Sequence, residues 1–188
     1  KHFLTKQTRA MPMNSNLGQI MPTMNIHFYK SEKIISATSQ NISDLLNCLK
    51  RHINSQYRTL SCLSGVDFSY SKHRFNVVYE LLGFTFFSRV RVKVFINEIT
   101  AISSAAKTFV NSDWMEREIW DLYGIYFSGH KDLRRILTDY GFEGFPMRKD
   151  YPLSGFVELR YDQNKKRIVV ENLELAQDFR FFSFESSW

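Results

Sequence analysis

The segment best suited to carry chemistry is "MEREIWD", in which Glu116, Glu118 and Asp121 fall within about one and a half turns of a predicted helix. Two carboxylates can act as general acid and general base when their environments separate their pKa values. Glu116 and Glu118 lie about 200° apart around a helix axis, so they cannot share one substrate atom. Arg117 and Asp121 are four residues apart and can pair. The segment thus favours a charged helix face, solvated or docked on a partner, over a catalytic dyad.

A second group of charges follows that helix, in "GHKDLRRIL" and "FPMRKDYP". It contains His130, Asp132, Arg134, Arg135, Arg148, Lys149 and Asp150. Arginine can bind a carboxylate through two parallel hydrogen bonds, so interleaved charges indicate specific ion pairs, either within the chain or across an interface. Nucleic-acid binding relies instead on unbalanced positive charge, which these segments lack.

Glycine and proline are dense in "GFEGFPMRKDYPL", residues 141–153, which predicts an irregular loop whose backbone N–H groups need partners. Pro146 and Pro152 restrict the backbone around Arg148 and Asp150, which favours a specific ion pair. We expect a neighbouring protein to cover this loop, and we expect Arg148→Ala to weaken assembly while sparing the fold of the isolated domain.

Motifs for cofactors and metals are missing from the sequence. It has no phosphate-binding glycine loop and no HExxH or GxSxG pattern, and its five histidines are scattered. Its two cysteines, Cys48 and Cys62, are too few for a zinc or iron-sulfur site and are expected to be reduced core residues. The longest nearly apolar run, "LLGFTFF", is far shorter than the roughly 18 residues of a membrane span. The sequence predicts a soluble or peripheral chain without a cofactor.

Hydrophobic periodicity predicts the elements that position these residues. We expect a helix over 42–54, strands over 57–68, 74–82 and 89–96, helices over 99–109 and 113–124, and short strands over 155–162 and 166–175, with no convincing element over 128–155. The fold class is α+β: an antiparallel three- to four-stranded sheet with helices packed on one face, followed by a long irregular C-terminal extension. Five aromatic residues in the last ten predict that the C-terminus packs on a protein surface.

Charge divides the chain unevenly. Residues 1–60 hold eight Lys and Arg against two Asp and Glu, whereas residues 61–188 are balanced. We therefore expect a basic N-terminal arm over 1–40, an α+β domain over 41–127 and an extended, partner-wrapping segment over 128–188. The arm has the composition of an organelle transit segment and equally of a plain basic arm. It also leaves open a nucleic-acid-binding module, whose affinity should fall steeply with salt.

The run from "WMEREIWDLYG" through "RKDYPLSGFVELRYD" resembles the signature region of the 30 kDa subunit family of respiratory complex I, NADH:ubiquinone oxidoreductase, in its mitochondrial form. The likeness covers roughly residues 41–184 and includes "RFNVVYELL", "RVRVKVFI" and "ELAQDFRFFSF". Two positions depart from the family pattern: Lys131 stands where proline is usual, and Phe145 where histidine is usual. No role of that histidine carries over.

The resemblance implies a core subunit of the hydrophilic arm, on the matrix side of the mitochondrial inner membrane, that contacts the membrane only through the complex. The complex uses NADH, FMN, iron-sulfur clusters and ubiquinone, but this chain is expected to hold no cofactor and to be inactive alone. Its main partner is expected to be the 49 kDa quinone-site subunit. The interface residues are expected to be Glu116, Arg117, Glu118, Asp121, His130, Asp132, Arg134, Arg135, Arg148, Lys149 and Asp150. A free-standing enzyme using Glu116, Glu118 and Asp121 would instead need activity in the isolated chain.

Overall fold

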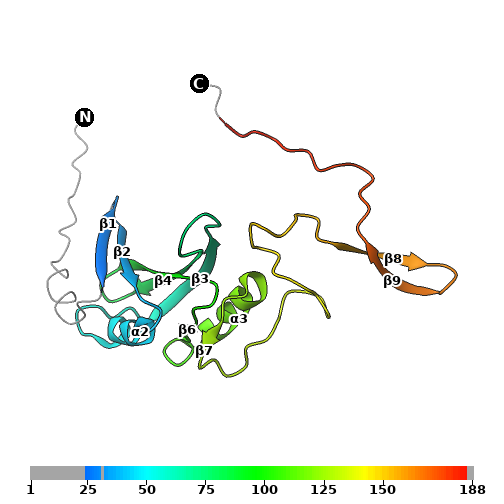
Figure 1. Cartoon of the computed structure of the whole chain (residues 1–188). Helices are drawn as coiled ribbons and strands as arrows, with labels where there is room; N and C mark the ends of the chain where they lie inside the picture. The colour runs from blue at the N-terminus through cyan, green and yellow to red at the C-terminus, as the bar shows by residue number, and fades with distance from the viewer. Residues whose placement is uncertain (1–23, 31, 186–188) are drawn as a thin grey trace, which may run out of the picture. The chain divides into compact units, whose positions relative to one another are not determined.

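The computed structural model describes residues 24–30 and 32–185 (Figure 1). In chain order its elements are β1 (Asn25–Tyr29), β2 (Glu32–Ala37), α2 (Ile42–Arg51), β3 (Thr59–Asp67), β4 (Phe75–Gly83), β5 (Ser88–Ile96), β6 (Ile102–Ser103), α3 (Ser112–Tyr123), β7 (Phe127–Ser128), β8 (Val157–Asp162) and β9 (Arg167–Asn172). The fold is therefore a mixture of helix and sheet in the α+β class, as the sequence predicts.

Five strands form the main sheet, in the order β1-β2-β5-β4-β3. Neighbours are antiparallel except β2 and β5, which run parallel with Lys33 opposite Val90. The sheet was expected to have three or four antiparallel strands. It has five, and one of its strand pairs is parallel. Because residues 25–37 supply β1 and β2, the sheet begins before the expected boundary at residue 40. The part of the basic arm over 1–23 lies outside the described residues.

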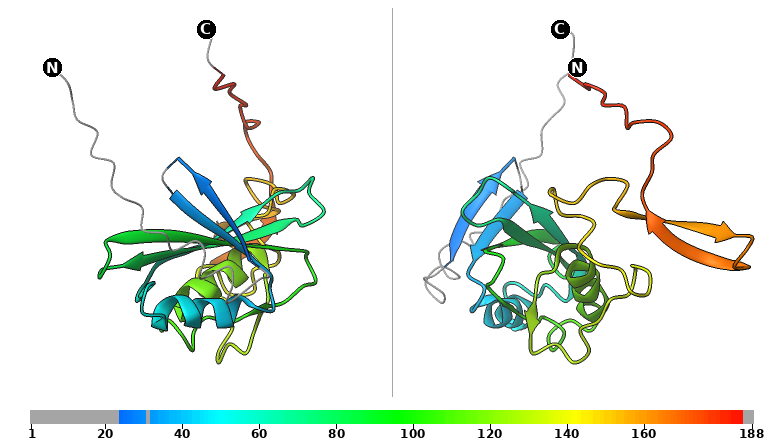
Figure 2. Two further views of the ribbon diagram at one scale, coloured as in Figure 1. Left: turned by 90° about the vertical axis from the view of Figure 1, so that its left-hand side faces the viewer. Right: turned by 45° about the vertical axis from the view of Figure 1, so that its right-hand side comes forward.

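The strands predicted over 74–82 and 89–96 are confirmed as β4 and β5. Val90, Val92 and Val94 are at most 1% exposed, and opposite them on β4 lie three buried side chains, those of Leu81, Tyr79 and Val77. Leu45, Leu46 and Leu49 of α2 belong to the same hydrophobic core. Both helices lie below the sheet in Figure 2 (left). Each large apolar side chain buried in this way stabilises the fold by about 1.5–3 kcal/mol.

The helix predicted over 99–109 is wrong. Residues 102–103 form the short strand β6, which pairs in parallel with β7, and turns follow. Serine can satisfy backbone groups outside a helix, and here Ser104 Oγ accepts a hydrogen bond from the Ala106 N–H at 3.2 Å. The next helix, α3, ends at Gly124 as predicted, where φ is 75°.

The chain divides into two compact units between Lys149 and Asp150. Residues 128–149 belong to the first unit, which differs from the boundary expected at 127. In the second unit β8 and β9 form an antiparallel hairpin, and residues 173–185 have no regular secondary structure. Within the described ranges, no helix has the length and apolarity required to cross a membrane.

Candidate functional site: a polar network around helix α3

Helix α3 buries charged side chains as well as apolar ones. Glu116 and Asp121 are fully buried, Arg117 is 9% exposed, and Glu118 is exposed. The sequence left two readings of this helix face, solvated or docked on a partner. For Glu116, Arg117 and Asp121 both are wrong, because their own chain buries these side chains. We call these three residues and their polar contacts the α3 network.

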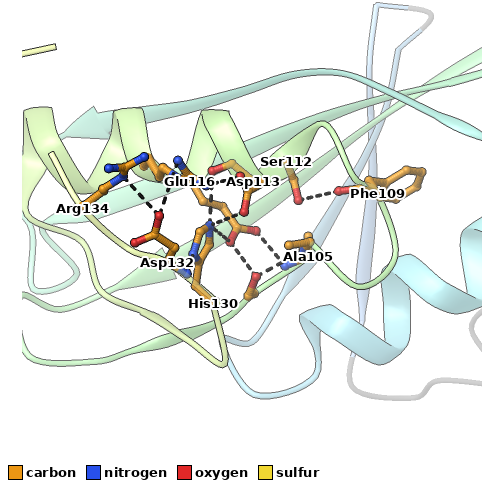
Figure 3. Close-up of polar contacts among 11 residues, drawn as sticks. Ala105, Phe109, Ser112, Asp113, Glu116, His130, Asp132 and Arg134 are labelled. Atoms are coloured by element: carbon orange, nitrogen blue, oxygen red, sulfur yellow. Dashed lines mark hydrogen bonds and ion pairs between the residues drawn. The ribbon is translucent and has the colours of Figure 1, made fainter. Parts of the chain in front are cut away.

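Glu116 holds the turn that follows β6 (Figure 3). Its carboxylate accepts hydrogen bonds from Ser104 Oγ at 2.6 Å and from the Ala105 N–H at 2.7 Å. Burial raises the pKa of Glu116 above its ordinary value, although these hydrogen bonds oppose the shift. The carboxylate therefore anchors a backbone turn from inside the core.

His130 joins the loop after β7 to the first turn of α3 (Figure 3). Its side chain is fully buried, and Nε2 lies 3.2 Å from the Asp113 carbonyl oxygen and 3.3 Å from Asp113 Oδ1. Because Nδ1 accepts a hydrogen bond from the Asp132 N–H at 3.1 Å, Nε2 carries the ring hydrogen and donates it to Asp113. The predicted pairing of Arg117 with Asp121 is not formed: Arg117 pairs with Asp113 at 2.5 Å.

Asp121 fixes the segment that follows. Its carboxylate accepts hydrogen bonds from the backbone N–H groups of Ile136, Leu137 and Thr138, at 3.2, 2.7 and 2.9 Å. Thr138 Oγ1 donates at 2.7 Å and Arg135 lies 3.2 Å away. Burial alone raises the pKa of Asp121, but the hydrogen bonds outweigh it and hold the pKa below its ordinary value. One carboxylate thus replaces the secondary structure that residues 136–138 lack.

Asp67, at the end of β3, ties down the end of the first unit. Arg74 binds it with two hydrogen bonds, at 2.9 and 3.0 Å, and the Lys149 N–H donates to it at 2.8 Å. The hydrogen bond from Arg74 is the main reason why the pKa of Asp67 lies below its ordinary value. Residue 149 is therefore fixed to the sheet, 82 residues back along the chain.

Arg148 also contacts its own chain. Its Nε donates to the Tyr123 carbonyl oxygen at 2.7 Å, and its guanidinium lies over the rings of Phe145 and Phe75, at 4.5 and 5.2 Å from their centroids. A Cβ on Gly124 would lie 2.7 Å from both Arg148 and Phe145. Arg148→Ala removes these contacts within the domain and should therefore destabilise it. This differs from the expectation that Arg148→Ala spares the fold of the isolated domain.

Several amides of 141–153 have partners within the chain. Phe142, Met147, Arg148 and Lys149 donate their N–H groups to Asp139 O, Leu122 O, Phe145 O and Asp67 Oδ2. A neighbouring protein was expected to supply these partners, and for these four amides that expectation is wrong. Residues 142–149 of the loop are held by their own unit, in part by α3 and β3.

Other predicted site residues lie on the surface. Glu118, Asp132, Arg134, Lys149 and Asp150 are exposed. Arg134 pairs with Asp132 at 3.1 Å, and Arg135 Nη2 donates to the Gly144 carbonyl oxygen at 2.9 Å. Their role in an interface stays a prediction.

Sequence reasoning missed Asp67, Arg74, Asp113 and Thr138. The spacing of Asp113 and Arg117 on one helix is the signal that could have identified one of these contacts. Asp67 and Arg74 are seven residues apart across the β3–β4 turn, and Thr138 is 17 residues from Asp121, so no spacing within one element reveals these contacts. Between residues 24 and 185, Ser31 aside, no cluster of three or more His, Cys, Asp or Glu side chains could hold a metal ion.

This geometry holds loops in place. Hydrogen bonds from the chain occupy the buried carboxylates Glu116, Asp121 and Asp67. A general base must reach the proton it removes, and these carboxylates already accept hydrogen bonds from backbone amides and side chains of their own chain. The α3 network therefore fixes residues that have little secondary structure, such as 136–138, by hydrogen bonds to buried carboxylates.

A family model described as the respiratory-chain NADH dehydrogenase 30 kDa subunit matches residues 35–157. The chain belongs to this family. The range that matches the 30 kDa family contains β3, β4, β5, the α3 network and every predicted site residue.

Curated relatives agree with this membership of the 30 kDa family. NADH-ubiquinone oxidoreductase subunit 9 of Reclinomonas americana is 51% identical over 86% of this chain and 79% of its own length. The subunit 9 of Prototheca wickerhamii is 42% identical, over 85% of this chain and 83% of its own. An Arabidopsis thaliana protein named NADH dehydrogenase [ubiquinone] iron-sulfur protein 3 is 51% identical, over 77% of this chain and 76% of its own.

A solved structure resembles the fold. It comes from the membrane-bound sulfane sulfur reductase, an archaeal respiratory membrane complex, with a TM-score of 0.63 and 20% identity over 73% of this chain and 82% of that one. At 20% identity this likeness supports the fold of the chain and no statement about its function.

Proposed function

We propose that the chain is a core structural subunit of the hydrophilic arm of proton-pumping NADH:ubiquinone oxidoreductase, supporting electron transfer to ubiquinone without doing redox chemistry itself. The observation that carries the proposal is the family match over residues 35–157, which contains the whole α3 network. The relatives' names place those proteins in NADH-ubiquinone oxidoreductase. Matrix-side location at the mitochondrial inner membrane follows as part of the same proposal.

The absence of a cofactor is part of the proposal. Some relatives carry the words iron-sulfur protein in their names. Iron-sulfur clusters are held mostly by four cysteine thiolates, and this sequence has two cysteines, Cys48 on α2 and Cys62 on β3. The buried carboxylates are bonded to their own chain, which argues for a positioning role.

The β8–β9 hairpin supports a docking role for the second unit. The register puts Val157, Leu159 and Tyr161 on one face with Val170 and Ile168, and all five are more than half exposed. An isolated two-stranded hairpin is at best marginally stable, so an apolar face of this kind requires cover. We propose that the 49 kDa quinone-site subunit covers it.

Affinity purification tests the proposal. A tagged full-length chain, isolated from detergent-solubilised mitochondrial membranes, should bring down NADH:ubiquinone reductase activity together with FMN and iron-sulfur signals. The same chain purified alone should show neither activity nor visible absorbance. Failure to recover the oxidoreductase, or stoichiometric flavin or cluster in the lone chain, contradicts the proposal.

A further inference from the structure

One end of the main sheet exposes aromatic and apolar side chains from three neighbouring segments. The β4–β5 turn exposes Phe84, Phe86 and Phe87, at 59%, 43% and 93%. Phe28 and Tyr29 lie at the end of β1, and Ile53 lies after α2. We call these six residues, with Lys30, Lys50, Arg51, Arg58 and Arg89, the sheet-end surface.

Contacts and register bring the three segments together. Thr85 Oγ1 donates to Gln56 Oε1 at 2.8 Å, which ties the β4–β5 turn to the loop after α2. On the other side Lys33 of β2 pairs with Phe28 of β1 and with Val90, so the end of β1 lies near the start of β5. Figure 2 (left) shows the β4–β5 turn at the same end of the sheet as the C-terminus of α2.

The charge of this surface is positive. Lys50, Arg51, Gln56 and Arg58 line a hollow of about 330 Å³. The sequence has no Asp or Glu between Asp44 and Asp67, or between Glu80 and Glu98. In the part of the chain that the structure describes, no carboxylate pairs with the guanidinium groups of Arg51, Arg58 or Arg89.

Nearby charges show the contrast. Arg91, two residues after Arg89, pairs with Glu80 and with Glu32. Lys50 donates to the Thr108 carbonyl oxygen and is thereby engaged within the chain. The arginines of the sheet-end surface thus stand out as cations that pair with no carboxylate among the described residues.

We propose that the sheet-end surface is a docking surface for an acidic, amphipathic segment of another subunit. Arginine and aromatic residues are the types enriched at protein interfaces and among their energetic hot spots. Arginine also binds carboxylates with two hydrogen bonds, which suits acidic side chains entering the hollow. Residues 1–23 of this chain contain no Asp or Glu, so they lack the complementary charge. The partner rests on the proposed function, because it is a subunit of the same complex.

Photocrosslinking in the assembled complex tests this inference. A photoreactive amino acid at Phe86 of the full-length chain should crosslink to one other subunit, at a segment that has apolar residues and at least two carboxylates. The double variant Arg51→Glu with Arg58→Glu should lower the yield about tenfold or more, since like charges oppose docking. Phe87→Asn should also lower it, and asparagine tolerates the φ of 46° at this position. Lys72→Glu, an exposed cation in the β3–β4 turn, should leave the yield unchanged.

Several outcomes overturn the proposal. These are crosslinks to lipid, to RNA, to a second copy of this chain or to a segment without carboxylates, and a yield that neither variant changes. Thermal melting of each variant separates lost docking from lost folding. If the chain does not co-purify with the oxidoreductase, the proposed function fails first; if it does and no crosslink forms, only the docking surface is refuted.

Discussion

At Asp121, one buried carboxylate accepts hydrogen bonds from three successive backbone amides and a threonine hydroxyl. Asp121→Asn replaces one acceptor oxygen with an NH₂ group that faces donors. We expect it to lower the free energy of unfolding by about 3 kcal/mol, because each hydrogen bond to a charged group contributes about 1.5–3 kcal/mol. Urea denaturation measures this. Glu118→Gln, exposed on the same helix, is the matched control and should change stability by no more than about 0.5 kcal/mol. Equal effects would contradict the anchoring role.

Glu116 predicts a pH dependence of the opposite kind to that of Asp67 and Asp121. Its pKa is raised above 4.5 by burial, so the folded state binds the proton more tightly than the unfolded chain. The free energy of unfolding should therefore fall as the pH rises from 4.5 through the raised pKa. The lowered pKa values of Asp67 and Asp121 instead contribute stability above 3.8, which is lost as the pH falls through those values.

Denaturation at several pH values checks the assignment to Glu116. Glu116→Gln removes the titrating group and keeps one acceptor oxygen for the Ala105 N–H. The variant should therefore lose the part of the decline above pH 4.5 that Glu116 causes, while the acid limb below pH 3.8 stays. If the free energy of unfolding of both proteins falls equally as the pH rises above 4.5, Glu116 does not cause the decline.

At the scale of elements, local periodicity predicted the parts whose contacts are nearby. The amphipathic helix over 42–54 and the alternating strands β4 and β5 were predicted because one apolar face explains each pattern. Strand β2 pairs in parallel with β5 across an intervening helix and hairpin, so its register depends on distant residues. The failure at 99–109 has a similar cause, because Glu116 holds that turn.

Two glycines allow a test at the end of α3. Gly124 and Gly129 have φ values of 75° and 76°, so alanine is strained at both by about 1–2 kcal/mol. A Cβ at Gly129 meets nothing within 4 Å, whereas at Gly124 it meets Arg148 and Phe145 at 2.7 Å. Gly124→Ala should therefore cost about 1–3 kcal/mol more than Gly129→Ala. Urea midpoints of the two variants measure the difference, and equal midpoints would show that Arg148 and Phe145 do not pack there.

For the whole molecule, the sequence predicted the types of the site residues better than their partners. Glu116, Asp121, Arg135 and Arg148 were singled out as expected interface residues, and each makes specific contacts within its own chain. Their partners are mostly backbone amides and carbonyls, such as the Ile136 N–H and the Tyr123 carbonyl oxygen, which no side-chain pattern reveals. The boundary at Lys149 depends in the same way on a contact with Asp67. The buried carboxylates Glu116 and Asp121, which were expected at an interface, thus support segments of their own chain.

The division at Lys149 predicts that folding and assembly can be separated. Among the described residues, the buried hydrophobic core runs from Met24 to Phe127, and the Lys149 N–H donates to Asp67 of β3. A chain ending at Lys149 should therefore unfold in one cooperative transition, with a stability within about 1 kcal/mol of the full chain, since surface changes away from the core have small effects.

The same truncated chain should not enter the oxidoreductase, because it lacks the apolar face of the β8–β9 hairpin. Calorimetry of the truncated protein and native gels of membranes expressing it measure the two properties. A truncated chain that assembles normally would refute the docking role of the hairpin, and one that fails to fold would refute the independence of the first unit.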